Sequence, residues 1–250
     1  MAEKTNWIFI RGLVRSNEHW GQFLEEFKRS FPDSEIILLE LEGNGKKNNQ
    51  KSYLSVEKNY QKLRQEWLLK RKSTNNWNII AVSLGAMVGM LWDSKHQDFK
   101  HSFYINTSSA DLAHPLERLS WPVVKQAYAI LRQKNSKDYE RRVLELTTQM
   151  TKIDTKLLTK WDQIHRLAPT TRLNLIRQLF AASRYIAPIK LNSKGNFIAS
   201  KKDILAKYTC SQKLAKKLNA SFFLHPQAGH DLPLDDPQWL IEVIKNNISS

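Results

Sequence analysis

The chain has 250 residues, a formal net charge of +15 and an apolar content of 41%, which suits one large folded domain or two small ones and argues against disorder. No apolar run approaches the roughly 20 residues needed to cross a bilayer, and the first residues lack the features of a secretory signal. Because Cys210 is the only cysteine, an internal disulfide is excluded and a thiol-ligated metal site is not expected. We therefore expect a cytoplasmic protein, and its charge raises the question of an anionic partner.

Short apolar runs alternate with amphipathic stretches along most of the chain. Strands are predicted at 7–10, 35–41, 78–82, 101–107, 195–200 and 220–224. Helices are predicted at 17–31, 55–72, 206–218 and 237–248, and another begins just after Ser83. This alternation predicts a mostly parallel α/β sheet with helices on both faces.

Residues 112–190 interrupt the alternation. They contain no convincing strand but four amphipathic helical segments, at 122–133, 139–150, 155–165 and 170–183. A helical insertion between two strands of such a sheet is typical of a lid. We therefore expect one domain, with a core formed by 1–111 and 191–250 and an inserted helical lid at 112–190.

A serine stands where the third predicted strand turns into a helix, in the segment Ala81-Val82-Ser83-Leu84-Gly85. The pattern G-x-S-x-G describes a sharp strand-to-helix turn that exposes a nucleophilic serine, and Ala81 replaces its first glycine. Small residues are needed on both sides because strand and helix approach closely there. Alone, Ser83 would more often be an ordinary serine, such as a cap for the following helix, so the chain must also supply a base and an acid.

Two polar loops follow the last two predicted strands, at the strand ends where catalytic loops lie in open α/β sheets. Asp203 follows the strand at 195–200, and His230 follows the strand at 220–224. Asp111, after the fourth strand, is an alternative acid, and Asp203 could instead cap the next helix. His230 could be a loop histidine without a role, and the adjacent Asp231 is expected to cap or pair locally.

The chain order Ser83, Asp203, His230 resembles that of the α/β-hydrolase family. The segment Gly229-His230-Asp231-Leu232-Pro233-Leu234-Asp235-Asp236-Pro237, which leads into a terminal helix, resembles the family's catalytic-histidine loop. The likeness covers nearly the whole chain, although the usual N-terminal hairpin is missing. It implies the α/β-hydrolase fold, with Ser83 as nucleophile, His230 as general base and Asp203 as the acid that orients it.

Arg11-Gly12 resembles the His-Gly oxyanion loop of the same family, with arginine in place of histidine. The resemblance implies an oxyanion hole made by the backbone N–H groups of Leu13 and Leu84. Because these donors belong to the main chain, the replacement need not destroy the hole. Arg11 would either bind an anionic group of the substrate or form an ion pair. Such a hydrolase requires no metal and no organic cofactor, so none is expected.

The implied reaction is hydrolysis of a carboxylic ester or thioester through an acyl-enzyme. A C–C bond hydrolase would use the same three residues, and a non-catalytic protein could retain them while binding an acidic partner through its lid. Residues 112–190 hold 15 Lys and Arg against six Asp and Glu. Either the lid's helices are simply solvated, or they attract an acidic carrier protein, an acyl-phosphate group or an anionic surface.

An acidic carrier would suit an esterase similar to those that act on pimeloyl-carrier-protein methyl ester. No recognition motif for nucleic acid accompanies the charge, so a nucleic-acid partner is not expected.

Overall fold

A computed structural model describes residues 5–73, 75–114, 118, 123, 125–126, 129–130, 132–133 and 135–248. Its strands form one six-stranded sheet in the order β2-β1-β3-β4-β5-β6, and every pair of neighbours in it is parallel. The strands are β1 (Asn6–Ile10), β2 (Ile36–Leu39), β3 (Trp77–Val82), β4 (His101–Ile105), β5 (Lys194–Ser200) and β6 (Ser221–His225). The predicted parallel α/β sheet is confirmed.

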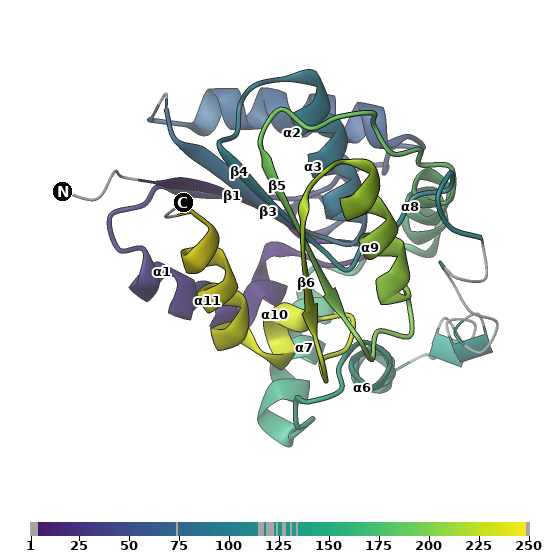
Figure 1. Cartoon of the computed structure of the whole chain (residues 1–250). Coiled ribbons are helices and arrows are strands. Elements are labelled where there is room, and N and C mark those ends of the chain that lie inside the picture. Colours follow the sequence, from purple (N-terminus) through teal and green to yellow (C-terminus); the bar gives the residue numbers. More distant parts are fainter. Residues whose placement is uncertain are drawn as a thin grey trace.

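Helices cover both faces of this sheet (Figure 1). They are α1 (Gly21–Ser30), α2 (Val56–Lys70), α3 (Leu84–Lys95), α9 (Tyr208–Lys217) and α11 (Pro237–Ile248). The described residues also form the short helices η1 (Asn17–Trp20), η2 (Gly45–Lys47) and α10 (Leu232–Asp235). Of these, η2 and α10 were not predicted.

Successive side chains of each strand enter two separate cores, because side chains alternate between the faces of a sheet. On β1, Ile8 and Ile10 belong to the core that includes residues of α2, α3 and α9. Trp7 and Phe9 belong to the core that includes residues of α1 and α11. Burial on both faces explains why the strands read as continuous apolar runs rather than alternating ones.

Between β4 and β5, the described residues include the helices α6 (Ser136–Thr147), α7 (Thr155–Leu167) and α8 (Arg172–Ser183). They correspond to three of the four helices predicted within 112–190. Of the fourth, predicted at 122–133, residues 123, 125–126 and 129–130 are helical, and 122, 124, 127–128 and 131 lie outside the described residues. The side chains of Asn135, Asp154 and Thr171 cap their N-termini, as these residue types favour.

The inserted helices meet the core beside α10, where α6 and α7 lie near the end of β6 (Figure 1). Leu144 of α6 and Trp161 of α7 form a small buried cluster, and Leu234 of α10 packs against it. Within the part of the chain that the structure describes, no helix is long and apolar enough to cross a membrane.

Candidate active site

Ser83 occupies the turn between β3 and α3 in a backbone conformation that residues with side chains seldom adopt, with φ 56° and ψ −118°. Its N–H donates to the carbonyl oxygen of Ile105 at 2.8 Å, and the Thr107 hydroxyl donates to its carbonyl oxygen at 3.0 Å. Strained backbone of this kind persists only where its surroundings fix it, and it clusters at functional sites. The serine therefore lies on the sharp strand-to-helix turn that its sequence context predicts.

Glycines make room for this turn. A Cβ on Gly85 would lie 2.6 Å from the carbonyl oxygens of Ile10 and Arg11, and one on Gly12 would lie 2.9 Å from the Cβ of Ser83. The loop after β1 therefore runs directly against the serine. Ala81 stands where the pattern has glycine, and its methyl group faces Gly89 of α3. Even a Cβ built on Gly89 would lie 3.5 Å from that methyl group, so alanine fits at this position.

The two backbone groups expected to form an oxyanion hole flank this contact. Leu13 follows Gly12, and Leu84 is the first residue of α3, whose first N–H groups have no partner within the helix. Among the described residues, neither N–H has a recorded hydrogen-bond acceptor. Both are thus able to donate to a negatively charged oxygen.

His230 and Asp203 lie together although they follow different strands. The Nδ1 atom of His230 and the Oδ2 atom of Asp203 are 2.7 Å apart, and the other carboxylate oxygen accepts from the N–H groups of Leu205 and Ala206. Burial lowers the pKa of His230, but the charge of Asp203 and its hydrogen bond, helped by Asp231, outweigh burial and leave that pKa raised. With Nδ1 donating to Asp203, Nε2 is left as the basic nitrogen.

The alternative acid lies elsewhere. Asp111 binds the Nζ atom of Lys217 at 2.7 Å and accepts from the N–H of Ala187 at 3.0 Å. Burial alone would raise the pKa of Asp111. Its hydrogen bonds with the Lys217 ammonium and the Ala187 N–H outweigh burial, so the pKa of Asp111 is lowered. The carboxylate that contacts His230 is that of Asp203.

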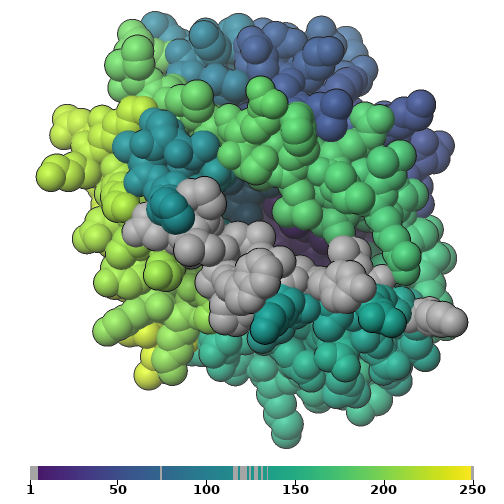
Figure 2. Space-filling model, turned by 90° about the vertical axis from the view of Figure 1, so that its right-hand side faces the viewer, coloured from purple at the N-terminus to yellow at the C-terminus, as the bar shows by residue number. Residues whose placement is uncertain are grey.

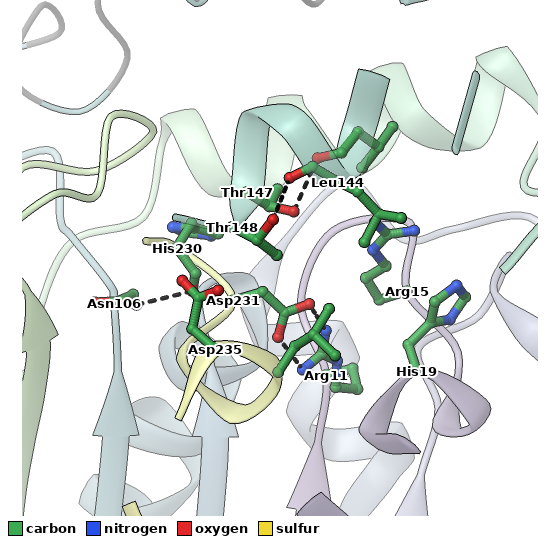
Figure 3. Close-up of polar contacts among 12 residues, drawn as sticks. Arg11, Arg15, His19, Asn106, Leu144, Thr147, Thr148, His230, Asp231 and Asp235 are labelled. Atoms are coloured by element: carbon green, nitrogen blue, oxygen red, sulfur yellow. Dashed lines mark hydrogen bonds and ion pairs between the residues drawn. The ribbon is translucent and has the colours of Figure 1, made fainter. Parts of the chain in front are cut away.

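Asn106, which the sequence reading missed, links the histidine loop to the end of β4. Its Nδ2 atom donates to the carbonyl oxygens of His230 and Gly229, at 2.8 and 3.2 Å (Figure 3). Its Oδ1 atom accepts from the N–H of Ser200 at 2.8 Å. A polar residue that ends a buried strand was the available sequence signal.

No hydrogen bond joins the Ser83 hydroxyl to His230, two residues that the structure describes. The Ser83 backbone is hydrogen-bonded to Ile105, and the loop that carries His230 is hydrogen-bonded to the next residue, Asn106. The turn at Ser83 and the histidine loop therefore both meet the end of β4. Hydrogen bonds between catalytic groups are often long in unliganded proteins and tighten with substrate.

Arg11 forms a buried, two-pronged ion pair with Asp231, with N–O distances of 3.0 and 2.7 Å and both side chains 4% exposed (Figure 3). Its guanidinium also lies 4.9 Å from the ring centroid of Trp20. Burial raises the pKa of Asp231, but Arg11 outweighs it and leaves that pKa lowered. Of the two roles expected for Arg11, the structure contains the ion pair.

A second buried ion pair joins the loop after β1 to the inserted helix α6. Arg15 and Glu140 are 2.9 Å apart, and His165 of α7 contacts the other oxygen of Glu140 at 3.1 Å. Burial raises the pKa of Glu140, but the Arg15 charge outweighs it and leaves that pKa lowered. Nearby, burial and the charge of Arg15 hold the pKa of His19 well below its usual value.

The histidine loop is also fixed to the junction of α6 and α7. The N–H of Asp231 donates to the carbonyl oxygen of Thr147 at 2.8 Å. The carboxylate of Asp235 accepts from the N–H of Gly229 at 2.7 Å, and it accepts further N–H groups from Gln149, Met150 and Thr151. The inserted helices therefore contact both the loop after β1 and the histidine loop.

A hollow opens on the face shown in Figure 2, between green and teal segments, and purple N-terminal residues form part of its floor. A cavity of about 160 Å³ lies at this junction of core and insertion. Its lining consists of Val14, Gln133, Asn135, Ser136, Tyr139, His165, Thr170, Arg172 and Leu175. Ser83 and His230 do not line it, but Val14 is only two residues from Gly12. No cluster of three metal-ligating side chains occurs among the described residues.

No protein-family model matches the sequence, and no curated protein is detectably similar to it. Solved structures do share its fold. A membrane phospholipase A, a bacterial virulence factor, superposes with a TM-score of 0.79 at 14% identity, over 100% of this chain and 80% of its own. A thermophilic esterase from Thermogutta terrifontis gives 0.71 at 15% identity, over 98% and 89%. MGS-M2, an α/β hydrolase from a Medee basin deep-sea metagenome, gives 0.71 at 16%, over 100% and 91%. At these identities the likeness establishes the fold alone.

Proposed function

We propose that this chain, which has the α/β-hydrolase fold, is a serine hydrolase that cleaves carboxylic esters or thioesters through an acyl-enzyme intermediate. One observation carries the proposal. His230 is hydrogen-bonded through Nδ1 to the buried Asp203, at the edge of the sheet where Ser83 lies on a strained turn. Because one fold hosts many functions, the proposal rests on this arrangement and not on the names of similar structures.

In the proposed reaction, the Ser83 hydroxyl attacks the ester carbonyl while Nε2 of His230 takes its proton. Asp203 keeps the proton of the imidazole on Nδ1 and stabilises the imidazolium that forms. His230 then gives the proton to the departing alcohol or thiol, which leaves the acyl group on Ser83. A water molecule, deprotonated by the same histidine, releases the acid.

The tetrahedral intermediate carries a negative oxygen that needs fixed donors. The N–H groups of Leu13 and Leu84 would supply them, each worth about 3 kcal/mol of barrier. The close approach of Gly12 to Ser83 supports this assignment, because it brings the Leu13 peptide beside the nucleophile. The ion pair of Arg11 with Asp231 would hold this loop in place.

Hydrolysis of p-nitrophenyl esters of short acids, and of an acyl thioester, tests the proposal. The Ser83→Ala protein is expected to lose turnover. Asp203→Asn is expected to lower kcat on the order of 10⁴-fold, because the imidazole takes the wrong tautomer. Asp111→Asn serves as the matched control and should retain activity. A folded wild-type protein that hydrolyses none of these substrates, or a Ser83→Ala protein as active as wild type, would contradict the proposal.

A further inference from the structure

Helix α8 has the reverse of the polarity usual for a surface helix, whose apolar side faces the core. The side chains of Asn174 and Gln178 point inward and are 4% and 2% exposed. Leu173 and Ile176 point outward and are 57% and 59% exposed, and Leu179 and Phe180 are exposed beside them. The helix therefore buries amides and presents aliphatic and aromatic side chains to solvent.

Hydrogen bonds fix α8 in this orientation. Asn174 accepts from the N–H of Ser52 at 3.0 Å and donates to the carbonyl oxygen of Gln50 at 2.9 Å. Gln178 donates to the side chain of Asn44 at 2.8 Å and to that of Ser52 at 3.0 Å. Rotating the helix to bury its apolar face would leave these amides and their partners without hydrogen bonds, which is costly for buried polar groups.

The exposed apolar side chains gather around this helix. Of the thirteen large apolar side chains that are exposed in the described residues, seven fall within 167–189. They are Leu167, Leu173, Ile176, Leu179, Phe180, Ile186 and Ile189. Single exposed apolar residues are normal, whereas a cluster marks an interaction site. We name these seven residues the α8 face.

The segment that carries the α8 face has charges of one sign. Residues 167–190 contain no Asp and no Glu but four Lys and Arg, namely Arg172, Arg177, Arg184 and Lys190, and the nearby carboxylate of Asp111 is paired with Lys217. Arg184 lies over the ring of Phe180, with 5.1 Å between its guanidinium carbon and the ring centroid. A symmetric contact between two copies would place the α8 face of one against the α8 face of the other. The positive charges of the two copies would then repel each other. The partner that fits is therefore an anionic one, not a second copy.

We propose that the α8 face docks on an anionic phospholipid surface. Its apolar side chains would enter the boundary between headgroups and acyl chains, while the surrounding Arg and Lys bind lipid phosphates, as in interfacial amphipathic helices. Leu167 and Ile189, the most exposed of the set, precede and follow α8 in the chain. A fluid lipid surface accommodates separately projecting side chains, whereas a protein partner would need a pocket for each.

Docking in this way would bring the candidate active site to the membrane. The Oε1 atom of Gln178, on the inner side of α8, accepts from the N–H of Val14 at 3.0 Å, and Val14 follows Leu13. Figure 2 faces the side on which α8 lies, and the green segment there borders the hollow. The docked surface therefore lies beside this hollow and beside the loop that carries Leu13, which points to membrane-lipid esters as the substrate class. This step alone rests on the proposed function; the docking does not.

Co-sedimentation with vesicles tests the docking. Wild-type protein is expected to pellet with vesicles of equal phosphatidylglycerol and phosphatidylcholine, less so at high salt, and much less with phosphatidylcholine alone. Ile176→Ser/Phe180→Ser should weaken binding about tenfold or more, because two inserted apolar side chains are lost. The matched control is Leu68→Ser/Leu69→Ser, which changes two exposed apolar residues of α2 and should bind as wild type does.

A second pair of variants tests the charge. Arg184→Gln/Lys190→Gln should reduce binding to anionic vesicles about 30-fold, which corresponds to about 2 kcal/mol for two charges. The matched control is Lys62→Gln/Lys72→Gln, which removes two positive charges from α2 and the residues just after it. This control should bind anionic vesicles as wild type does. All four double variants change exposed side chains, and circular dichroism checks that each is folded.

Three results would overturn the docking proposal. The first is wild-type protein that does not pellet with anionic vesicles, and the second is wild-type protein that binds neutral vesicles equally well. The third is an equal loss of binding in the α8 variants and their controls. Sedimentation velocity that shows a wild-type dimer dissociated by Ile176→Ser/Phe180→Ser would assign the face to a second copy instead. Binding of an acidic acyl carrier protein without vesicle binding would assign it to a protein. Turnover of a water-soluble ester without vesicles reports on the proposed function separately.

Discussion

The protonation of His230 depends on opposing local effects. Burial disfavours the imidazolium, and Arg11 adds to that, but Asp203 and Asp231 favour the charged form more strongly, so the pKa is raised. A histidine that acts as general base works only in its neutral form. In the proposed mechanism, the carboxylate that orients the ring would therefore also set the pH below which activity is lost.

The pH dependence of ester hydrolysis should reflect this balance. Because the neutral fraction of His230 falls as pH drops through its pKa, kcat/KM should decline on the acidic side with a midpoint above the usual histidine value of about 6.5. Asp203→Asn removes the largest stabiliser of the imidazolium, so its midpoint should move to lower pH. Asp111→Asn should leave the midpoint in place. An unmoved midpoint in Asp203→Asn would show that Asp203 does not act on the catalytic base.

At the scale of elements, the loop after β1 and the loop after β6 act as one unit because of the ion pair between Arg11 and Asp231. Arg11 directly precedes Gly12, which contacts Ser83, and Asp231 directly follows His230. The pair therefore joins the loop that lies against Ser83 to the chain neighbour of His230. Removing one member of a buried pair leaves an uncompensated charge in a low dielectric.

Arg11→Met is accordingly expected to lower the free energy of unfolding by about 3–5 kcal/mol, measured by urea denaturation. The double variant Arg11→Met/Asp231→Leu should recover most of this loss, because neither charge then remains buried. Lys70→Met, which breaks the exposed pair of α2 with Glu66, should cost less than about 1 kcal/mol. If the double variant is as unstable as the single one, the loss does not come from an unpaired charge.

The elements themselves could be predicted because their signals are local. Strands buried on both faces leave apolar runs, and the small residues around Ser83 mark the turn. The choice between Asp203 and Asp111 had no such signal, since both follow strands and only the packing of the loops decides which reaches His230. The partner of Arg11 lies 220 residues away, and no local pattern contains that information. The roles of Glu140 and Asp235 as links to the inserted helices were missed for the same reason.

At the scale of the whole molecule, the parallel sheet brings the candidate residues together. Ser83, Asp203 and His230 follow β3, β5 and β6, and in a parallel sheet all strand ends of one kind lie at the same edge. The inserted helices are linked to loops at that edge through Thr147 and Glu140. The division into a core at 1–111 and 191–250 and a lid at 112–190 remains a prediction.

The central claim is that this assembly activates Ser83. The most direct measurement is the intact mass of the protein after treatment with a fluorophosphonate, followed by peptide mapping. The account predicts one adduct, on Ser83, which forms on wild type and on the control Ser94→Ala and is absent from Ser83→Ala. No adduct on folded wild-type protein, or an adduct that persists in Ser83→Ala, would contradict it.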